Sequence, residues 1–578
     1  MTDTATDTAT DTATDAAKPK KVCIVGGGAS GVGLLWCLAK AQQLGLTTDK
    51  WVIRLIHDDA NVGGHSRTVT VQMNGKPVEL DTGVQMIAPA MYPGLSCMLD
   101  LPEFAPVELQ HVDLRIACAF PPTDAATPYW GNFPAYQSTD LYKQGAAAAS
   151  VFQTLLSAAS LKKDPVELAE TVRQFLDKNA AAFPSPTALK LFTDYFLDPY
   201  MSIMNGYGAA RLGTTALVDI AALWDLGFAS FTEATEGYAR FAHGAQSWVK
   251  QMADLAKRQF GPGLQLTLNS SVTQIYPGTT GAPVVMWVDN KTKKQSLETF
   301  DMVVSTLDMQ TNSGVFNNPN NKSWATVYEP RIGVTAGQKS GTTVWPLIPG
   351  YCYVHQDASV LAPGMPQPSQ ETLQVTASYA GDGHGGYDLV KSYTTYVESN
   401  LLGIKLTNPS DEWYLTMYGF DPSDYGIKPP STKIPAFDWV HGMWMPTFML
   451  PQKLAFHTAQ GISQFHPARP GQQATGIFFT GNNLTMDSEE GALMSGLCLA
   501  KYAFGIDATR TLLPPPVPLG NLKTWAIAVI EFEALYELMF PSALLDPTSP
   551  ANPSNPSNPS SVLRSLESVM ARFLPLRR

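Results

Sequence analysis

Three glycine-rich segments hold the residues whose types and spacing could do chemistry. The first is Gly26-Gly27-Gly28-Ala29-Ser30-Gly31, which lies between the apolar run 22–25 and a segment, 34–39, with leucines at helical spacing. This pattern predicts a buried parallel strand, a tight turn and a helix. The first N–H groups of a helix have no partner within it, and the helix dipole favours negative charge there. The segment is therefore expected to bind the pyrophosphate of a dinucleotide.

Each glycine of this turn has a separate task in such a site. Gly26 permits the tight turn, Gly28 lets a phosphate approach the backbone, and Gly31 lets the helix lie close to the strand. Glycine-rich turns are common in proteins. The strand before this one and the helix after it favour nucleotide binding over an ordinary connection.

The second segment follows an expected strand at residues 51–57. A dinucleotide-binding βαβ unit normally has an acidic residue at the end of this strand, where it binds the adenosine ribose. Here the chain offers one histidine and two aspartates, at 57–59. The doublet Gly63-Gly64 comes next, and two strand-like runs then lead into Asp81-Thr82-Gly83-Val84. The second segment therefore continues the nucleotide-binding pattern of the first.

The third segment is a short strand that ends in Thr480-Gly481-Asn482 and is followed by a helix-like stretch, 488–497 (SEEGALMSGL). Small residues at 491, 492, 495 and 496 leave one face of that helix bare. A flat ring system or a pyrophosphate can approach the backbone there, and a helix N-terminus stabilises negative charge. The third segment thus predicts another contact with the same ligand.

The order and spacing of the three segments resemble the flavin-containing amine oxidase superfamily. The chain looks most like the branch in which GGH is followed by a strand and DTG, a branch related to polyenoic fatty acid isomerases. The resemblance implies FAD as the cofactor. The FAD site that it implies consists of Gly26, Gly28, Ala29, Ser30, Gly31, His57, Asp58, Gly63, Gly64, His65, Ser66, Arg67, Thr82, Gly83, Val84, Val272, Gly481, Asn482, Glu489, Glu490 and Ala492.

The resemblance also implies what several of these residues contact. The doublet Gly63-Gly64 would pass close to the pyrophosphate, and Ser66-Arg67 would lie against the phosphates or the flavin. The turn Thr82-Gly83-Val84 would lie near the isoalloxazine ring. Val272 would contact the adenine through its backbone.

The chain departs from the family at two positions. Where the family has a ribose-binding glutamate, this chain has His57, with Asp58 one residue later. An imidazole can still donate to or accept from a ribose hydroxyl, so the choice between the two residues stays open. Asn482 replaces an acidic residue of the family and keeps the ability to hydrogen-bond without the negative charge.

We expect an α/β fold in which a Rossmann-like FAD-binding domain is interleaved with a mixed-sheet substrate domain and a helical cap. The FAD-binding domain is assigned to 19–90, 236–310 and 470–510, the substrate domain to 91–120 and 311–469, and the cap to 121–235. The remaining segments are a disordered tail (1–18), a C-terminal helix (511–545) that packs on the body or touches a membrane, an NPS-repeat linker (546–561) and a basic amphipathic tail (562–578).

Helical patterns dominate the cap, at 140–161, 164–176, 185–204 and 214–226. By resemblance, this region covers the substrate cavity. Its aromatic side chains could line an apolar cavity, although each one taken alone is better explained as core. These residues are Phe192, Tyr195, Phe196, Tyr200, Tyr207, Trp224, Phe228 and Phe231. The apolar run 439–446 allows the same two interpretations.

Composition excludes several classes of protein. With 578 residues, 44% of them hydrophobic, the chain can bury a large core. A formal net charge of −11 argues against nucleic acid as a partner. The six cysteines are scattered, which argues against a disulfide framework or a zinc site. We expect a cytoplasmic protein without a bilayer span, and its tail 562–578 either touches a membrane surface peripherally or docks on the protein itself.

The implied chemistry is hydride transfer between flavin N5 and a carbon of a small apolar substrate. This transfer could oxidise or desaturate the substrate, or shift a double bond in a fatty acid or polyene. The alternative is an amine oxidase that produces imine and peroxide, although no motif identifies the lysine that such enzymes often use. A third interpretation, FAD as a structural group in a membrane-associated binding protein, rests only on the C-terminal tail.

No catalytic acid, base or nucleophile is assigned, because hydride chemistry requires none at a fixed spacing. His355 and Asp357 match an HxD segment of the GGH branch. Their spacing puts them on one face of a strand, and no third ligand at metal spacing accompanies them. A structural role is therefore favoured for this pair.

Overall fold

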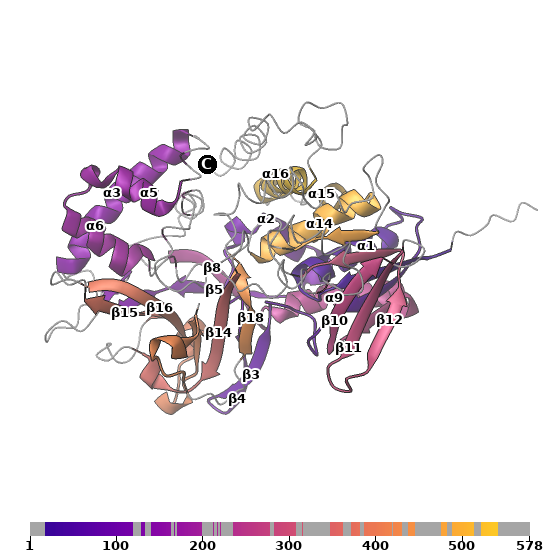
Figure 1. Ribbon diagram of the computed structural model, residues 1–578, viewed down its shortest axis with the longest axis horizontal. Coiled ribbons are helices and arrows are strands. Elements are labelled where there is room, and N and C mark those ends of the chain that lie inside the picture. Colours follow the sequence, from indigo (N-terminus) through magenta and orange to yellow (C-terminus); the bar gives the residue numbers. More distant parts are fainter. Residues whose placement is uncertain are drawn as a thin grey trace, which may run out of the picture.

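The computed structural model describes residues 18–119, 129–132, 140–162, 167, 170–198, 201, 212, 217, 220, 235–277, 282–307, 315, 347–361, 371–381, 387–418, 420–430, 437–444, 476–481, 488–513 and 522–540. Figure 1 shows two groups of elements side by side. One group, on the right of the view, is built on a parallel sheet, and the other on a larger mixed sheet with helices above it.

A five-stranded sheet, in the order β19-β13-β1-β2-β9, carries the glycine turn. Its strands are β1 (Lys20–Val25), β2 (Trp51–Ile56), β9 (Leu264–Thr267), β13 (Met302–Ser305) and β19 (Ile477–Phe479). Every neighbouring pair is parallel. The last four residues of β1, at the centre, are buried, as a strand covered on both faces requires. The predicted α/β fold with a Rossmann-like sheet is confirmed.

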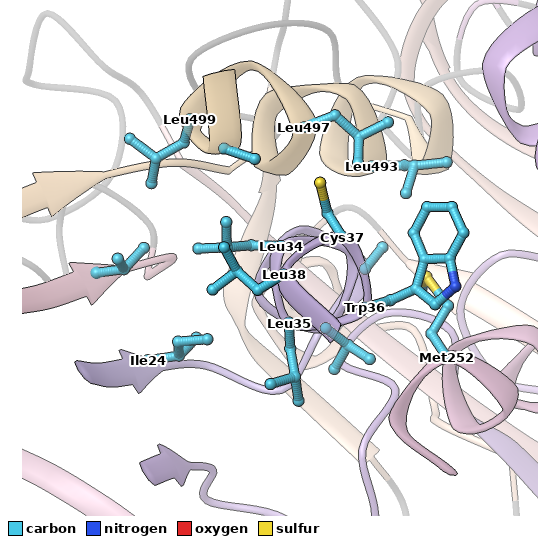
Figure 2. Packing of buried hydrophobic residues seen from close by; sticks show 14 of the residues in the cluster. Ile24, Leu34, Leu35, Trp36, Cys37, Leu38, Met252, Leu493, Leu497 and Leu499 are labelled. Carbon is cyan, nitrogen blue, oxygen red and sulfur yellow. The ribbon is translucent and has the colours of Figure 1, made fainter. Parts of the chain in front are cut away.

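The helices that pack on one another beside this sheet are α1 (Ala29–Gln43), α9 (Gln246–Phe260) and α14 (Glu489–Phe504). Helix α1 lies between the other two and is buried except at Lys40, Gln42 and Gln43. In Figure 2, Cys37 of α1 points toward α14 and Trp36 points toward α9. A helix that is apolar on all sides is surrounded by other elements of the protein. The contacts of α1 with α9 and α14 therefore fix the position of α1 and of the turn before it.

Three smaller antiparallel units flank the parallel sheet. They are the sheet of β10 (Ser270–Pro277), β11 (Pro283–Asp289) and β12 (Gln295–Thr299), the hairpin of β3 (Thr68–Met73) and β4 (Lys76–Asp81), and the pair of β5 (Leu109–Leu114) and β8 (Thr235–Phe241). The hairpin and β8 lie between the two groups of elements in Figure 1.

The second group is built on a seven-stranded sheet. Its strands, in spatial order, are β18 (Phe437–Trp444), β14 (Leu347–His355), β17 (Tyr414–Tyr418), β16 (Tyr387–Val397), β15 (Leu373–Gly381), β6 (Ile116–Ala119) and β7 (Tyr129–Gly131). Only the β15–β6 pair is parallel. Alternate residues such as Cys352, Val354 and Leu415 enter a second hydrophobic core.

Helices α3 (Asp140–Lys162), α5 (Val172–Lys178) and α6 (Pro186–Phe192) belong to this second core. The ring of Phe152 lies 5.3 Å from that of Phe192 and 6.2 Å from that of Phe175, measured between centroids. Phe192 and Phe196 are buried in the same core. These two rings therefore pack the core. Tyr200, Tyr207, Trp224, Phe228 and Phe231 lie outside the described residues.

One predicted helix is interrupted where its pattern indicates a continuous one. Residues 164–176 predicted a single helix with Pro165 in its first turn, but α5 begins at Val172. Thr171 is its N-cap: the hydroxyl accepts from the backbone N–H of Gln174 at 3.2 Å, and the Gln174 side chain accepts from the N–H of Thr171 at 2.9 Å. This capping box starts a new helix, so the prediction of a continuous one is wrong.

The C-terminal helix α16 (Leu522–Met539) lies within the predicted segment 511–545 and packs on α14 and on α2 (Pro93–Leu99). The rings of Tyr502 and Phe540 stack 4.1 Å apart, and Lys501 pairs with Glu533 at 2.9 Å. Helix α16 thus docks on the body. Within the described segments, no helix combines the length and the apolarity that crossing a bilayer needs. The linker and the basic tail, 546–578, lie outside them, and the domain boundaries stay predictions.

Candidate cofactor-binding site

The turn between β1 and α1 has the tight geometry that only glycine allows. Gly26 has φ +109°, and a β-carbon there would lie 2.0 Å from Oγ1 of Thr306. A β-carbon at Gly31 would lie 2.3 Å from the carbonyl oxygen of Gly26. Gly28 is the N-cap of α1 and brings no capping side chain, which leaves the first-turn N–H groups of Ala29 and Ser30 available to an anion.

The second glycine segment crosses the first at backbone distance. Gly28 and Gly63 form a parallel β-bridge, and the N–H of Gly63 donates to the carbonyl of Gly27 at 2.8 Å. Gly64 has φ +61°, and a β-carbon there would lie 2.9 Å from Cα of Gly28. Gln246 of α9 holds the second segment, because its side-chain amide donates to the carbonyl of Val62 at 2.8 Å. The two glycine segments therefore form one continuous backbone surface.

The imidazole of His57 lies against this crossing. Its side chain is 8% exposed, and a β-carbon at Gly27 would lie 2.8 Å from its Cγ and Cδ2. Nδ1 lies 3.1 Å from Oδ1 of Asp58, whereas Nε2 has no hydrogen-bond partner among the described residues. The backbone is fixed as well, because the N–H donates to Thr267 and the carbonyl accepts from Ser270. A buried ring nitrogen without a partner needs a ligand or water to satisfy it.

The structure separates the two candidates for the ribose contact. Adjacent residues at the end of a strand point to opposite sides, and here His57 points inward while the side chain of Asp58 is 58% exposed. Asp58 orients the imidazole. Arg67, predicted to lie against the phosphates, forms an ion pair with Asp59 at 3.3 Å.

The expected flavin-facing turn, at residues 82–84, lies beside the GGH segment, by which we mean the stretch that begins with Gly63-Gly64-His65 and runs to Arg67. The N–H of Thr82 donates to the carbonyl of Arg67 at 2.8 Å, and the N–H of Val84 donates to that of His65 at 3.3 Å. Gly83 lies between these two contacts. Ser66, which is fully buried, donates its hydroxyl to the carboxylate of Glu489. The second and third glycine-rich segments are therefore connected directly.

Three buried hydroxyls join the first and third segments. Oγ of Ser30 lies 3.0 Å from Oγ1 of Thr480 and 3.0 Å from Oγ of Ser495. Oγ of Ser495 also accepts from the N–H of Gly481 at 3.0 Å and donates to the carbonyl of Ala492 at 2.7 Å. We call Ser30, Thr480 and Ser495 the hydroxyl triangle. Its bonds hold the strand end of the third segment against the first turn of α1.

Ser495→Ala should lower the free energy of unfolding by about 2 kcal/mol, because it removes the acceptor of the Gly481 N–H and takes one hydrogen bond from each of the other two hydroxyls in a buried site. Urea unfolding measures the difference. The matched control is Ser247→Ala, which removes a half-buried hydroxyl bonded only to the carbonyl of Gly244 at 2.7 Å. Equal losses in the two variants would contradict the role assigned to the triangle.

The remaining predicted residues have varied surroundings. Glu490 is fully buried, and its carboxylate accepts from the N–H groups of Gly94 and Leu95 at 2.6 and 2.8 Å, so it caps α2. Val272 is half-buried in β10, where a bulge follows it. Asn482 lies outside the described residues. The cofactor contacts proposed for these three residues stay predictions.

A buried charge cluster, defined as Asp81, Arg240 and Glu398, lies behind the turn at residues 82–84. All three side chains are at most 5% exposed. The guanidinium interacts with both carboxyl groups, and no second buried cation shares them among the described residues. Burial raises the pKa of Asp81 to about 7 and that of Glu398 to about 8. The cluster was not predicted from the sequence, although an acid at the buried end of a strand was a signal for it.

These shifts predict how stability depends on pH. Because folding raises both pKa values, the stability that each group contributes is present below about pH 4 and is lost as the pH rises through about 7 and 8. Glu398→Gln should therefore raise the melting temperature more at pH 9 than at about pH 6. Thermal unfolding at a series of pH values measures this. Glu79→Gln, at a half-exposed carboxylate, is the control, and a pH-independent difference for Glu398→Gln would contradict the prediction.

His355 and Asp357 have structural surroundings. Nε2 of His355 lies 2.9 Å from Oγ1 of Thr416, and Nδ1 accepts from the N–H of Asp357 at 3.1 Å. Burial lowers the pKa of His355 to about 4, so it is neutral at physiological pH. The strand ends at His355, so Asp357 lies beyond it and caps the turn that follows. Across the described residues, no three His, Cys, Asp or Glu side chains cluster as a metal site requires.

Comparison with solved structures identifies the same fold elsewhere. An oxidoreductase from Methanosarcina mazei superposes with a TM-score of 0.50 at 11% identity, over 83% of this chain and 100% of that one. A triple mutant of putrescine oxidase gives 0.48 at 12%, over 84% and 99%, and cyclohexylamine oxidase from Brevibacterium oxydans gives 0.47 at 12%, over 85% and 99%. No protein-family model matches the sequence, and neither does any curated protein. The first comparison shows that the chain shares the fold of that protein.

Proposed function

We propose that this chain is a flavin-dependent oxidoreductase of the amine oxidase type, with FAD as its cofactor. One observation carries the proposal: the buried Nε2 of His57, beside a crossing of two glycine segments, has no hydrogen-bond partner in the part of the chain that the structure describes. A ribose hydroxyl would satisfy that nitrogen, and a pyrophosphate would bind at the N-terminus of α1.

The residues present fit an adenine dinucleotide with a flavin at its far end. Gly28, Gly63 and Gly64 would hold the pyrophosphate through backbone groups, and His57 would bind the ribose. The turn at residues 82–84, which hydrogen-bonds to the GGH segment, would support the isoalloxazine ring. When bound, the flavin supplies a hydride acceptor at N5. The protein supplies orientation and excludes water.

The negative side chains at the start of α14 limit what this helix can contribute. Glu489 and Glu490 occupy its first turn, where they offset the positive end of the helix dipole. Glu490 is engaged with α2 and Glu489 with Ser66. We therefore propose that α14 holds the three segments together, and that the first turn of α1 provides the main anion site.

We propose an apolar substrate that gives up a hydride from carbon. Two classes fit this chemistry: a fatty acid or polyene, with the hydride returned to shift a double bond or passed on to oxidise it, and an amine, which yields imine and peroxide. Both classes require an apolar chamber next to the flavin, and neither requires a charged nucleophile.

The test begins with purified protein. Its visible absorption and the identity of any nucleotide released on denaturation establish whether FAD binds. Anaerobic titration with amines, fatty acids and polyenes then identifies the substrate class. Bleaching by an amine, with peroxide on readmission of air, supports amine oxidation, whereas conversion of a polyene without net oxygen uptake supports isomerisation. A protein that stays colourless after incubation with FAD contradicts the proposal.

A further inference from the structure

Asp81 connects the turn at residues 82–84 to two other elements. Its Oδ1 accepts from Oγ1 of Thr68 at 2.7 Å and from the N–H of Ala245 at 2.7 Å. Thr68 is in β3 and Ala245 is the N-cap of α9. The backbone carbonyl of Asp81 also accepts from the side chain of Gln85, on the far side of the turn. Asp81 thus fixes both ends of the turn, one through its carboxylate and the other through its backbone.

The same carboxylate competes for a single buried cation. Arg240, in β8, donates to the carbonyl of Glu79 at 3.3 Å and interacts electrostatically with Asp81 and Glu398. Glu398 begins α12 (Glu398–Leu401) in the second group of elements, and its Oε1 has no hydrogen-bond partner among the described residues. Two buried carboxylates cannot both be compensated by one guanidinium, so ionisation of one opposes ionisation of the other.

Two other carboxylates near the cluster have partners of their own. Glu79 is half-exposed and lies 3.6 Å from His243, which is on the surface. Glu412 accepts from the N–H and the hydroxyl of Ser399, and interacts electrostatically with Glu398. Neither group bonds to Asp81. The cluster therefore contains two buried carboxyls, one from the β3–β4 hairpin and one from α12, and one buried cation that interacts electrostatically with both.

We propose that Asp81 is a positioning residue whose protonation state sets the conformation of the turn at residues 82–84, and through it the environment of the flavin. The second part of this inference rests on the proposed function. When Asp81 ionises, Arg240 is drawn toward it and away from Glu398. Since Asp81 leads directly into the turn, this movement would change how Thr82 and Val84 bond to the GGH segment.

The decisive variant is Asp81→Asn, which keeps an acceptor oxygen for Thr68 and Ala245 but cannot ionise. Hydrogen–deuterium exchange of the peptide that holds Thr82 and Val84, corrected for the intrinsic pH dependence of exchange, reports on the turn with or without cofactor. We expect the protection of this peptide in the wild type to change in a one-proton step centred near pH 7, and the step to be absent in Asp81→Asn. Glu79→Gln, the control, should keep it.

Bound flavin gives a second readout. Its absorption maximum should shift with the same midpoint in the wild type and stay constant in Asp81→Asn. If the exchange step is observed but the protein binds no flavin, the result supports the effect of Asp81 on the turn and rejects the proposed function. A flavin shift of equal size in the wild type and Asp81→Asn would overturn the inference. An exchange step with the same size and midpoint in these two proteins would overturn it as well.

If Asp81→Asn does not fold, Thr68→Val replaces it. This variant removes the hydroxyl that stabilises the ionised carboxylate, so the midpoint should move to higher pH. An unchanged midpoint in Thr68→Val would also overturn the inference.

Discussion

Gly64→Ala is expected to yield a folded protein that is purified without flavin. A β-carbon at residue 64 would lie 2.9 Å from Cα of Gly28, so the two glycine segments would have to move apart. Separating packed backbone typically costs about 1–3 kcal/mol, which corresponds to roughly a ten- to hundredfold weaker Kd. Fluorescence titration of the unloaded protein with FAD measures the change.

The chain offers a closely matched control for this variant. Gly45 has φ +68°, almost the same as the +61° of Gly64, but a β-carbon there would meet nothing within 4 Å. Gly45→Ala therefore carries the same backbone strain without the contact between segments. It should bind FAD as the wild type does. If both variants lost FAD to the same degree, strain would explain the effect and the crossing would not form the site.

His57→Leu is expected to weaken FAD binding about tenfold, because it removes one buried acceptor from the ribose at nearly constant volume. The leucine cannot bond to a ribose hydroxyl, and Asp58 loses the group that it orients. His57→Gln restores an acceptor and should recover part of the affinity. The Kd for FAD measured at one pH for all three proteins gives the comparison.

Two further measurements separate ribose binding from packing. His111, on β5, is exposed, so His111→Leu controls for the loss of an imidazole elsewhere. The affinity for FMN, which lacks the adenosine ribose, is expected to be the same in the wild type and His57→Leu. Equal loss of affinity for FMN and FAD in His57→Leu would mean that the imidazole supports the turn and does not contact the ribose.

The sequence predicted elements best where local pattern and end signals agree. Helix α9 shows this agreement, because its apolar face has helical spacing and Gly261, at φ +50°, ends it. Helix α5 was placed wrongly because an apolar pattern continued across Thr171. There the capping box, readable from Thr171 and Gln174, outweighed the periodicity.

The site itself was predictable only in part. Its glycines can be recognised in the sequence by their type and order. The choice between His57 and Asp58 depends on which side chain faces the glycine turn, and that contact joins two separate segments. From the sequence, Ser495 was recognised only as a small residue on the bare face of a helix. Its hydroxyl is used by Ser30, which is 465 residues away, and no local pattern encodes such a contact. The charge cluster is likewise assembled from three distant segments.

The hydroxyl triangle and the order of the parallel sheet have a consequence for biosynthesis. The glycine turn is translated first, but its neighbours β13 and β19 and the hydroxyl of Ser495 lie about 280 to 470 residues later. In a nascent chain on the ribosome, the edge of β1 that pairs with β13 therefore stays exposed until much of the chain has been synthesised. The nucleotide site is therefore incomplete until residues 477–495 have been synthesised, and chaperones that shield exposed strands are expected to act on this chain before the nucleotide does.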